Sequence, residues 1–82
     1  MDNYYTEVTS TIKRHLKKKY AFRLMNKLTG VEYTEERSNL DALIPGLSED
    51  TWEALIEKMY DDGYIAKDDG RTVTFTDEFV VV

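Results

Sequence analysis

The fold of this 82-residue chain is decided by residues 48–76, SEDTWEALIEKMYDDGYIAKDDGRTVTFT. Apolar residues from Trp52 to Tyr60 lie at spacings of 3, 1, 3 and 1, which predicts the buried face of an amphipathic helix. Ser48 is the expected N-cap of this helix, and Gly63 stands where a residue with positive φ would end it. We therefore expect a helix between these two residues, with Trp52 and Tyr60 on its core side.

A β-hairpin is expected directly after this helix, over residues 64–76. Asp69-Gly70 separates two β-prone runs and favours a tight hairpin turn, because both residue types tolerate positive φ. In the second run Val73 and Phe75 alternate with threonines, which indicates a sheet with one buried face and one wet face.

The N-terminal segment, residues 3–28, predicts either one long helix or two shorter helices that meet near residues 18–20. It contains no Gly or Pro, and Gly30 is the expected stop. Apolar side chains recur every three or four positions, which places them on one helical stripe. This stripe consists of Tyr5, Val8, Ile12, Leu16, Tyr20, Leu24 and Leu28, with Met25 beside it.

Between these parts, residues 35–44 predict a second, short helix that follows a β-prone segment at 31–34. Thr34 is its expected cap, and Pro45-Gly46 is expected to end it. The tail, residues 77–82, ends Phe-Val-Val-Val, so we expect it either to pack on the domain or to meet a partner. The expected common core comprises Leu40, Leu43, Leu55, Ile56, Met59, Ile65, Val73 and Phe75.

Length and composition predict a single domain, residues 1–82, and we expect a cytoplasmic protein. Without cysteine there is neither a disulfide framework nor thiolate chemistry, which suits a reducing compartment. No apolar run approaches the roughly 18 residues that span a bilayer, and the first residues lack the pattern of a signal peptide. We therefore expect no membrane partner.

The order helix, short β segment, helix, helix, hairpin resembles that of winged helix-turn-helix domains, as found in bacterial regulators. The resemblance lies in Leu55 and Met59 of the third helix and in the Gly63-Tyr64-Ile65 step into the first wing strand. Asp69-Gly70-Arg71 matches the wing tip, and Val73, Phe75 and Thr76 match the returning strand. The resemblance implies an α+β fold with a three-helix core and a C-terminal β-hairpin wing, to which this chain is expected to add an extended N-terminal helix.

Charge is strongly segregated along the chain, whose net charge is −5. Residues 1–31 hold seven basic residues against two acidic ones, a balance of +5. Residues 32–82 hold four basic residues against fourteen acidic ones, a balance of −10. Segregation of this kind bears on partners and on association rather than on fold.

Two functional hypotheses follow from the resemblance and the charges. In the first, the chain is a regulatory DNA-binding domain whose phosphate contacts are Lys13, Arg14, Lys17, Lys18, Lys19 and Arg71. In the second, it is a protein-interaction module that uses an acidic third-helix face formed by Glu49, Asp50, Glu53 and Glu57. Carboxylates on that face would repel duplex DNA, whereas a basic run on a helix is also typical of an ordinary solvated face.

We expect neither catalysis nor a cofactor or metal site. His15 is the only histidine, and with no cysteine it can complete neither a nucleophile–base pair nor a zinc site. Gly-rich phosphate loops are absent from the sequence. A homodimer through the N-terminal helix, the tail or both is expected, because oppositely charged segments can neutralise each other between copies.

Overall fold

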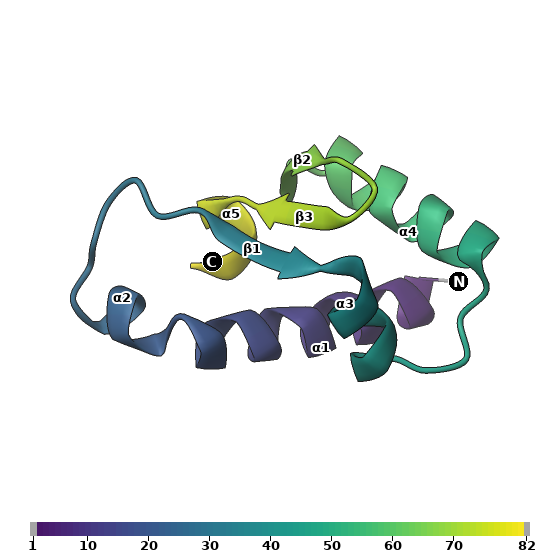
Figure 1. The fold of residues 1–82 in the computed structure, drawn as a ribbon, viewed down its shortest axis with the longest axis horizontal. Helices are drawn as coiled ribbons and strands as arrows, with labels where there is room; N and C mark the ends of the chain where they lie inside the picture. Colours follow the sequence, from purple (N-terminus) through teal and green to yellow (C-terminus); the bar gives the residue numbers. More distant parts are fainter. Residues whose placement is uncertain (1, 82) are drawn as a thin grey trace.

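The computed structural model describes residues 2–81. Within them the chain forms five helices and a small antiparallel sheet of three strands, an α+β arrangement (Figure 1). In chain order the elements are α1 (Asp2–Lys19), α2 (Ala21–Met25), β1 (Tyr33–Glu36), α3 (Arg37–Leu43), α4 (Glu49–Asp61), β2 (Ile65–Asp68), β3 (Thr72–Phe75) and α5 (Asp77–Val80).

The sheet has the order β1-β3-β2. The expected hairpin therefore forms from β2 and β3, and β1 pairs with the free edge of β3 as a third strand. Tyr33 and Ile65 both pair with Phe75, and a bulge interrupts the β2–β3 ladder after Ile65. In the turn only Gly70 uses positive φ, at 88°. Asp69 stabilises the turn differently, because its Oδ1 accepts hydrogen bonds from the backbone amides of Arg71 and Thr72.

Helix α4 begins and ends as its sequence predicts. The Ser48 Oγ accepts a hydrogen bond from the Thr51 amide at 3.2 Å, which confirms the cap. At the other end Gly63 has φ of 82°, and the amide of Tyr64 donates to the Met59 carbonyl at 2.9 Å. This is the hydrogen bonding of a Schellman motif, which satisfies the last carbonyls of a helix.

One buried cluster joins the helices to the sheet. It contains seven of the eight residues expected there, while Leu43 is only partly buried at its edge. Trp52 is buried as predicted, and its Nε1 donates to Asp41 of α3 at 2.9 Å. The prediction for Tyr60 was wrong, since 56% of its surface is exposed. Met59 takes the inward position, which turns the neighbouring Tyr60 side chain toward the hairpin side of α4.

The N-terminal segment forms two helices rather than one, with the break at Tyr20. The prediction that Gly30 ends it was wrong, because α2 stops at Met25. Lys27 adopts φ of 53°, and the Leu28 amide donates back to the Arg23 carbonyl at 3.1 Å. A helix terminus of the Schellman type therefore forms three residues early, at a lysine.

The second helix starts later than predicted. Residues 33–36 form β1, so Thr34 lies in a strand and is not a helix cap. Glu36 takes the N-cap position of α3 without a side-chain hydrogen bond. Pairing with β3 decides this boundary, because it buries the alternate residues Tyr33 and Glu35.

The tail packs on its own domain through the short helix α5. Phe79 and Val80 are 1% and 0% exposed, and Phe79 stacks on Phe75 with ring centroids 5.2 Å apart. Of the two alternatives expected for the tail, packing on its own domain is confirmed for these two residues, which leaves them unable to contact a second chain. Val81 is exposed, and residue 82 lies outside the described range.

Candidate functional site

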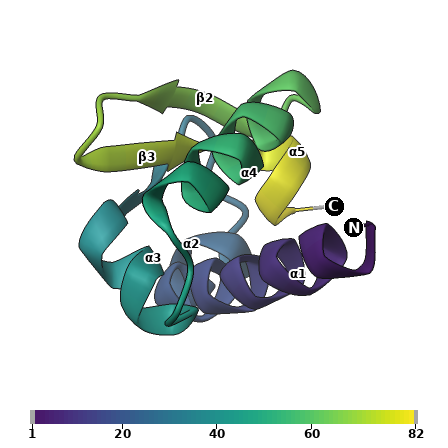
Figure 2. The same cartoon turned by 90° about the vertical axis from the view of Figure 1, so that its right-hand side faces the viewer.

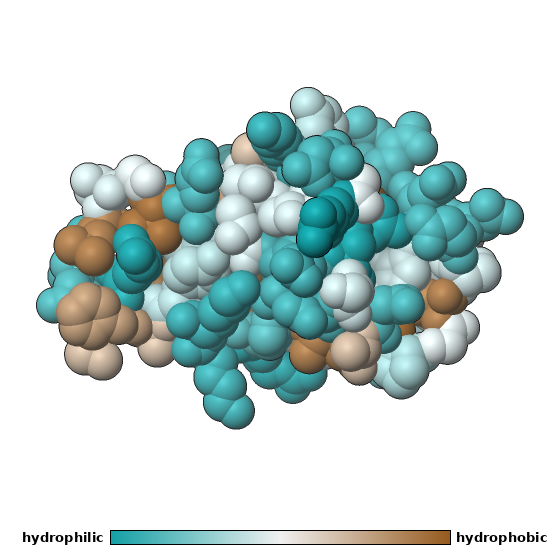
Figure 3. All heavy atoms as spheres, in the orientation of Figure 1, coloured by the Kyte–Doolittle hydropathy of each residue, from teal (hydrophilic) through white to brown (hydrophobic). Residues whose placement is uncertain are grey.

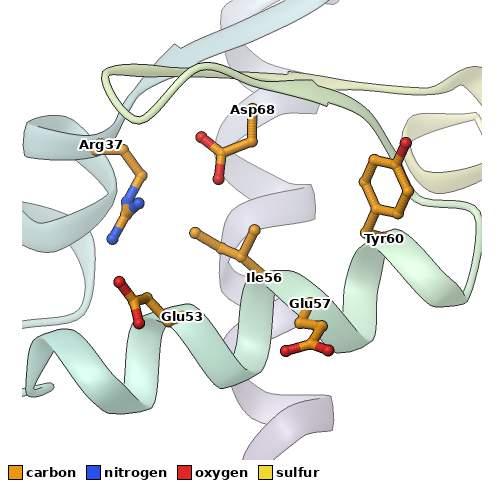
Figure 4. Close-up of a pocket in the computed structure, with 6 residues that line it drawn as sticks. All are labelled: Arg37, Glu53, Ile56, Glu57, Tyr60 and Asp68. Carbon is orange, nitrogen blue, oxygen red and sulfur yellow. The ribbon is translucent and has the colours of Figure 1, made fainter.

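A shallow groove lies between α4 and the hairpin, with a volume of about 320 Å³. Helix α4 supplies Glu53, Ile56, Glu57 and Tyr60, α3 supplies Arg37, and β2 supplies Asp68 (Figure 4). Figure 4 shows that Glu53 and Arg37 point toward each other across one end of the groove, while Asp68 points into it from the hairpin. The groove thus combines an apolar floor with a charged rim.

The predicted acidic residues Glu49, Asp50, Glu53 and Glu57 are all exposed on α4. One cation compensates them in part, because Arg37 Nη2 donates to Glu49 Oε1 at 3.1 Å. The Arg37 side chain is only 17% exposed, and it lines the same end of the groove as Glu53 (Figure 4). The surface that α4 presents is therefore negative.

The six residues predicted to contact phosphates do not come together. Lys19 is occupied, since its Nζ lies 3.2 Å from both Glu35 Oε2 and the Thr34 carbonyl. Lys13 is partly buried, with its Nζ 5.4 Å from the centroid of the Phe79 ring. Arg71 lies at the hairpin turn, away from α1 (Figures 1 and 2). Arg14, Lys17 and Lys18 are exposed together on one side of α1.

This cationic surface faces away from α4. Helix α1 buries Val8, Ile12 and Leu16 in the core that also receives Trp52 and Met59 of α4. Figure 1 shows α1 and α4 on different sides of the molecule, and both helices direct their apolar sides into one core, so their exposed sides face away from each other. The acids of α4 and the exposed cations of α1 therefore lie on different faces of the molecule.

A buried carboxylate, Glu35, was missed by the sequence reasoning. It is 2% exposed, and its oxygens meet His15 Nε2, Lys19 Nζ, Asn39 Nδ2 and the Glu36 amide. Burial opposes its ionisation, but these hydrogen bonds outweigh burial and lower the pKa of Glu35 to about 2. This network joins α1, β1 and α3, and its physical role is to hold those elements together.

An apolar surface was also missed. Phe22, Met25 and Leu28 are 72%, 77% and 47% exposed. We call these three residues the apolar end, because they gather over α2 and the following loop at one end of the molecule, visible as brown atoms at the left of Figure 3. The prediction that Leu28 continues the buried stripe was wrong, because the chain leaves the helical path after Met25. Phe22 and Met25, three residues apart, were the available signal for a second apolar side.

No helix formed by residues 2–81 is long and apolar enough to cross a membrane. The described part of the chain holds no group of three or more His, Cys, Asp or Glu side chains placed to bind a metal ion.

No protein-family model, curated protein or solved structure matches this chain.

Proposed function

We propose that this chain is a protein-interaction module of winged-helix layout, and that its α4–β2 groove binds a basic segment of a protein partner. The order and pairing of the elements support the layout. The N-terminal helix pair α1–α2, the strand β1, the helices α3 and α4 and a hairpin follow in sequence, and β1 pairs with the returning strand of the hairpin. With α1–α2 counted as the first helix of this layout, α4 is the third helix and the β2–β3 hairpin is the wing.

The acidic rim of the groove is the observation that carries the proposal. Glu53, Glu57 and Asp68 surround a site whose floor is Ile56 and whose end is the exposed ring of Tyr60. Carboxylates select lysine or arginine, while an aromatic ring and an aliphatic floor accept the apolar part of the same segment. Complementary charge also steers a basic partner to this face.

The same rim opposes binding of DNA through α4. Duplex DNA carries about one negative charge per 1.7 Å of axis, so a third helix that enters the major groove would place these carboxylates among phosphates. The exposed cations Arg14, Lys17 and Lys18 lie on a different face and cannot offset this repulsion. A regulatory role would then depend on a protein contact rather than on base reading.

A titration followed by amide NMR tests the proposal with two probes. One is a peptide of about 12 residues, rich in arginine with a central leucine, and the other is a mixed-sequence DNA duplex. We expect the peptide to shift the amide signals of Glu53, Tyr60 and Asp68 in a saturable way. Replacing Glu53 and Glu57 together by glutamine should weaken peptide binding by about 10-fold, because two rim charges are lost.

The matched control replaces Glu7 and Glu32 by glutamine, because both are exposed, lie outside the groove and change the net charge equally. This control should bind the peptide with nearly the affinity of the unmodified chain. The proposal fails if the control weakens binding as much as the groove variant does. It also fails if the DNA duplex, rather than the peptide, saturates the α4 signals.

One observation favours the DNA hypothesis in a restricted form. Arg14, Lys17 and Lys18 remain exposed on α1, and no acidic residue lies between positions 8 and 31. These cations can hold phosphates without reading bases. Such binding would be independent of sequence and would not use α4.

A further inference from the structure

The apolar end is surrounded by cations. Arg23 lies between Phe22 and Met25 in α2, and Lys27 follows α2 in the loop. Lys17 and Lys18 end α1 directly before it, and all four cations are exposed. An apolar patch of this kind on a small domain marks an interaction site. A surface that combines apolar side chains with cations is complementary to an apolar pocket that is flanked by carboxylates.

The same chain carries such a pocket, which we call the α1–α4 pocket. Its apolar lining comes from Tyr4 and Tyr5 at the start of α1 and from Ala54 and Leu55 of α4, and its volume is about 520 Å³. Thr51, Asp50 and Lys58 complete it. Glu57 is the i+3 neighbour of Ala54 on the exposed face of α4, and Asp50 is its i−4 neighbour, so two carboxylates frame the small exposed Ala54.

Lys58, the cation in the lining of the pocket, contacts an aromatic ring of the same lining. Lys58 Nζ lies 4.8 Å from the centroid of the Tyr5 ring. The Tyr5 hydroxyl donates to Asp62 Oδ2 at 2.6 Å, so the first turn of α1 is fixed against the end of α4. These contacts hold Tyr5 against α4 on one side of the pocket. Tyr4, which is 41% exposed, forms the outer edge of the pocket.

We propose that the α1–α4 pocket receives the apolar end of a second copy of this chain. Phe22 and Met25 of one copy would enter between Tyr4 and Ala54 of the next, and Arg23 and Lys27 would face Asp50 and Glu57. Charge complementarity favours this occupant, because Asp50, Glu57 and Asp62 outnumber Lys58 around the pocket, whereas the cations Arg23 and Lys27 flank the apolar end. A symmetric pairing of two apolar ends would instead bring Arg23 and Lys27 against like charges.

The position of the two surfaces determines the kind of assembly. The molecule is 36 Å long, with α2 at one end and the first turns of α1 and α4 at the other (Figures 1 and 2). Contact between opposite ends is heterologous, and it builds an open chain of copies when the rotation between neighbours does not close. A contact made by a few side chains of each copy falls below the roughly 800 Å² per partner of a standard interface, so we expect association to be weak and concentration-dependent.

The test exploits the two different surfaces of a head-to-tail contact. Phe22→Asp removes the apolar end, and Ala54→Arg fills the pocket with a bulky cation. In sedimentation velocity from about 10 to 500 µM, the unmodified chain should grow beyond a dimer with concentration, while each variant alone should remain monomeric. An equimolar mixture of the two variants should form a 1:1 dimer and nothing larger, because each variant keeps one intact surface.

Charge-matched controls are Ser10→Asp and Ser10→Arg, at an exposed position of α1 outside both surfaces. Both controls should assemble as the unmodified chain does. Because Phe22 and Ala54 are exposed, the two test variants should keep the circular dichroism spectrum of the unmodified chain.

Three results would overturn the proposal: an unmodified chain that stays monomeric throughout, an assembly that stops at a dimer, or a variant mixture that fails to pair. Binding of the monomer to phosphatidylglycerol vesicles, abolished by Phe22→Asp, would likewise overturn it and assign the apolar end to a lipid surface.

Discussion

Glu35 shows how much a single residue depends on its surroundings in this protein. Its carboxylate is buried, yet it is fully paired with groups from α1, β1 and α3. No side-chain N or O atom that is buried among the described residues lacks a hydrogen-bond partner. Breaking such a network leaves buried polar groups unpaired, which costs more than the network contributes when it is intact.

We predict that Glu35→Gln destabilises the fold at neutral pH by roughly 1–3 kcal/mol. The pH dependence follows from the pKa of Glu35, which falls from an ordinary 4.5 to about 2 on folding. Because the folded state binds this proton more weakly, the stabilisation is complete above pH 4.5 and is lost as pH falls toward 2. The amount is up to about 3 kcal/mol.

Urea unfolding at pH 7 and at pH 3 measures this effect. The loss of stability between the two pH values should be smaller for Glu35→Gln than for the unmodified chain. The matched control, Glu32→Gln at an exposed position, should leave the loss unchanged. An identical loss in the Glu35 variant would show that its carboxylate is not the titrating group.

At the scale of elements, tertiary packing determines two features that the sequence pattern leaves open, namely the break between α1 and α2 and the short helix α5. The break between α1 and α2 falls at Tyr20, whose hydroxyl meets the backbone of Thr34 and whose ring packs edge-on against Tyr33 at 5.3 Å. At the other end, α5 is only four residues long and is held by Phe79 and Val80 in the core. Tertiary contact rather than helix propensity stabilises so short a helix.

We predict that Phe79→Ala costs about 3–5 kcal/mol of unfolding free energy, because it removes a buried ring that contacts Phe75 and Tyr64. Urea unfolding monitored by tryptophan fluorescence measures the change. Val81→Ala is the control, since Val81 is 57% exposed and should change stability by no more than about 0.5 kcal/mol. A cost for Phe79→Ala below about 1 kcal/mol would mean that the tail is not part of the core.

At the scale of the whole molecule, exposed charge is unevenly distributed, because acids predominate on α4 and cations predominate on the C-terminal half of α1. Helices α4 and α1 lie on different sides of the molecule in Figure 1, and each buries its apolar side in the shared core and exposes its charged side. Separated charges of this kind orient an approaching partner and respond to salt over a screening length of about 8–10 Å. The molecule therefore presents two surfaces that select different partners.

We predict that any binding to duplex DNA is weak, depends steeply on salt and uses the α1 cations. Replacing Lys17 and Lys18 together by alanine should then lower the slope of log affinity against log salt by about 2, because two phosphate contacts are lost. Glu53→Ala should leave DNA affinity unchanged or raise it. Fluorescence anisotropy with two unrelated duplexes measures both effects, and a loss of sequence-specific affinity in Glu53→Ala would show that α4 does read bases.

Local signals in the sequence determined the best-defined elements. The apolar spacing of α4, its Ser48 cap and Gly63 end, and the Asp69-Gly70 turn all operate within a few residues, so they persist whatever the rest of the chain does. The four acids of α4 follow from the same period, because fixing the buried side of a helix also fixes its exposed side.

Only the tertiary structure decided which elements face each other. The sequence could not place Glu35 in a buried strand, since pairing of β1 with the distant β3 overrides the helical pattern of residues 35–44. Nor could it show that Phe22, Met25 and Leu28 are uncovered, or that Tyr4 and Ala54 line one pocket. Period and capping act along the chain, whereas burial depends on which segments meet, and that is settled only when the whole core closes.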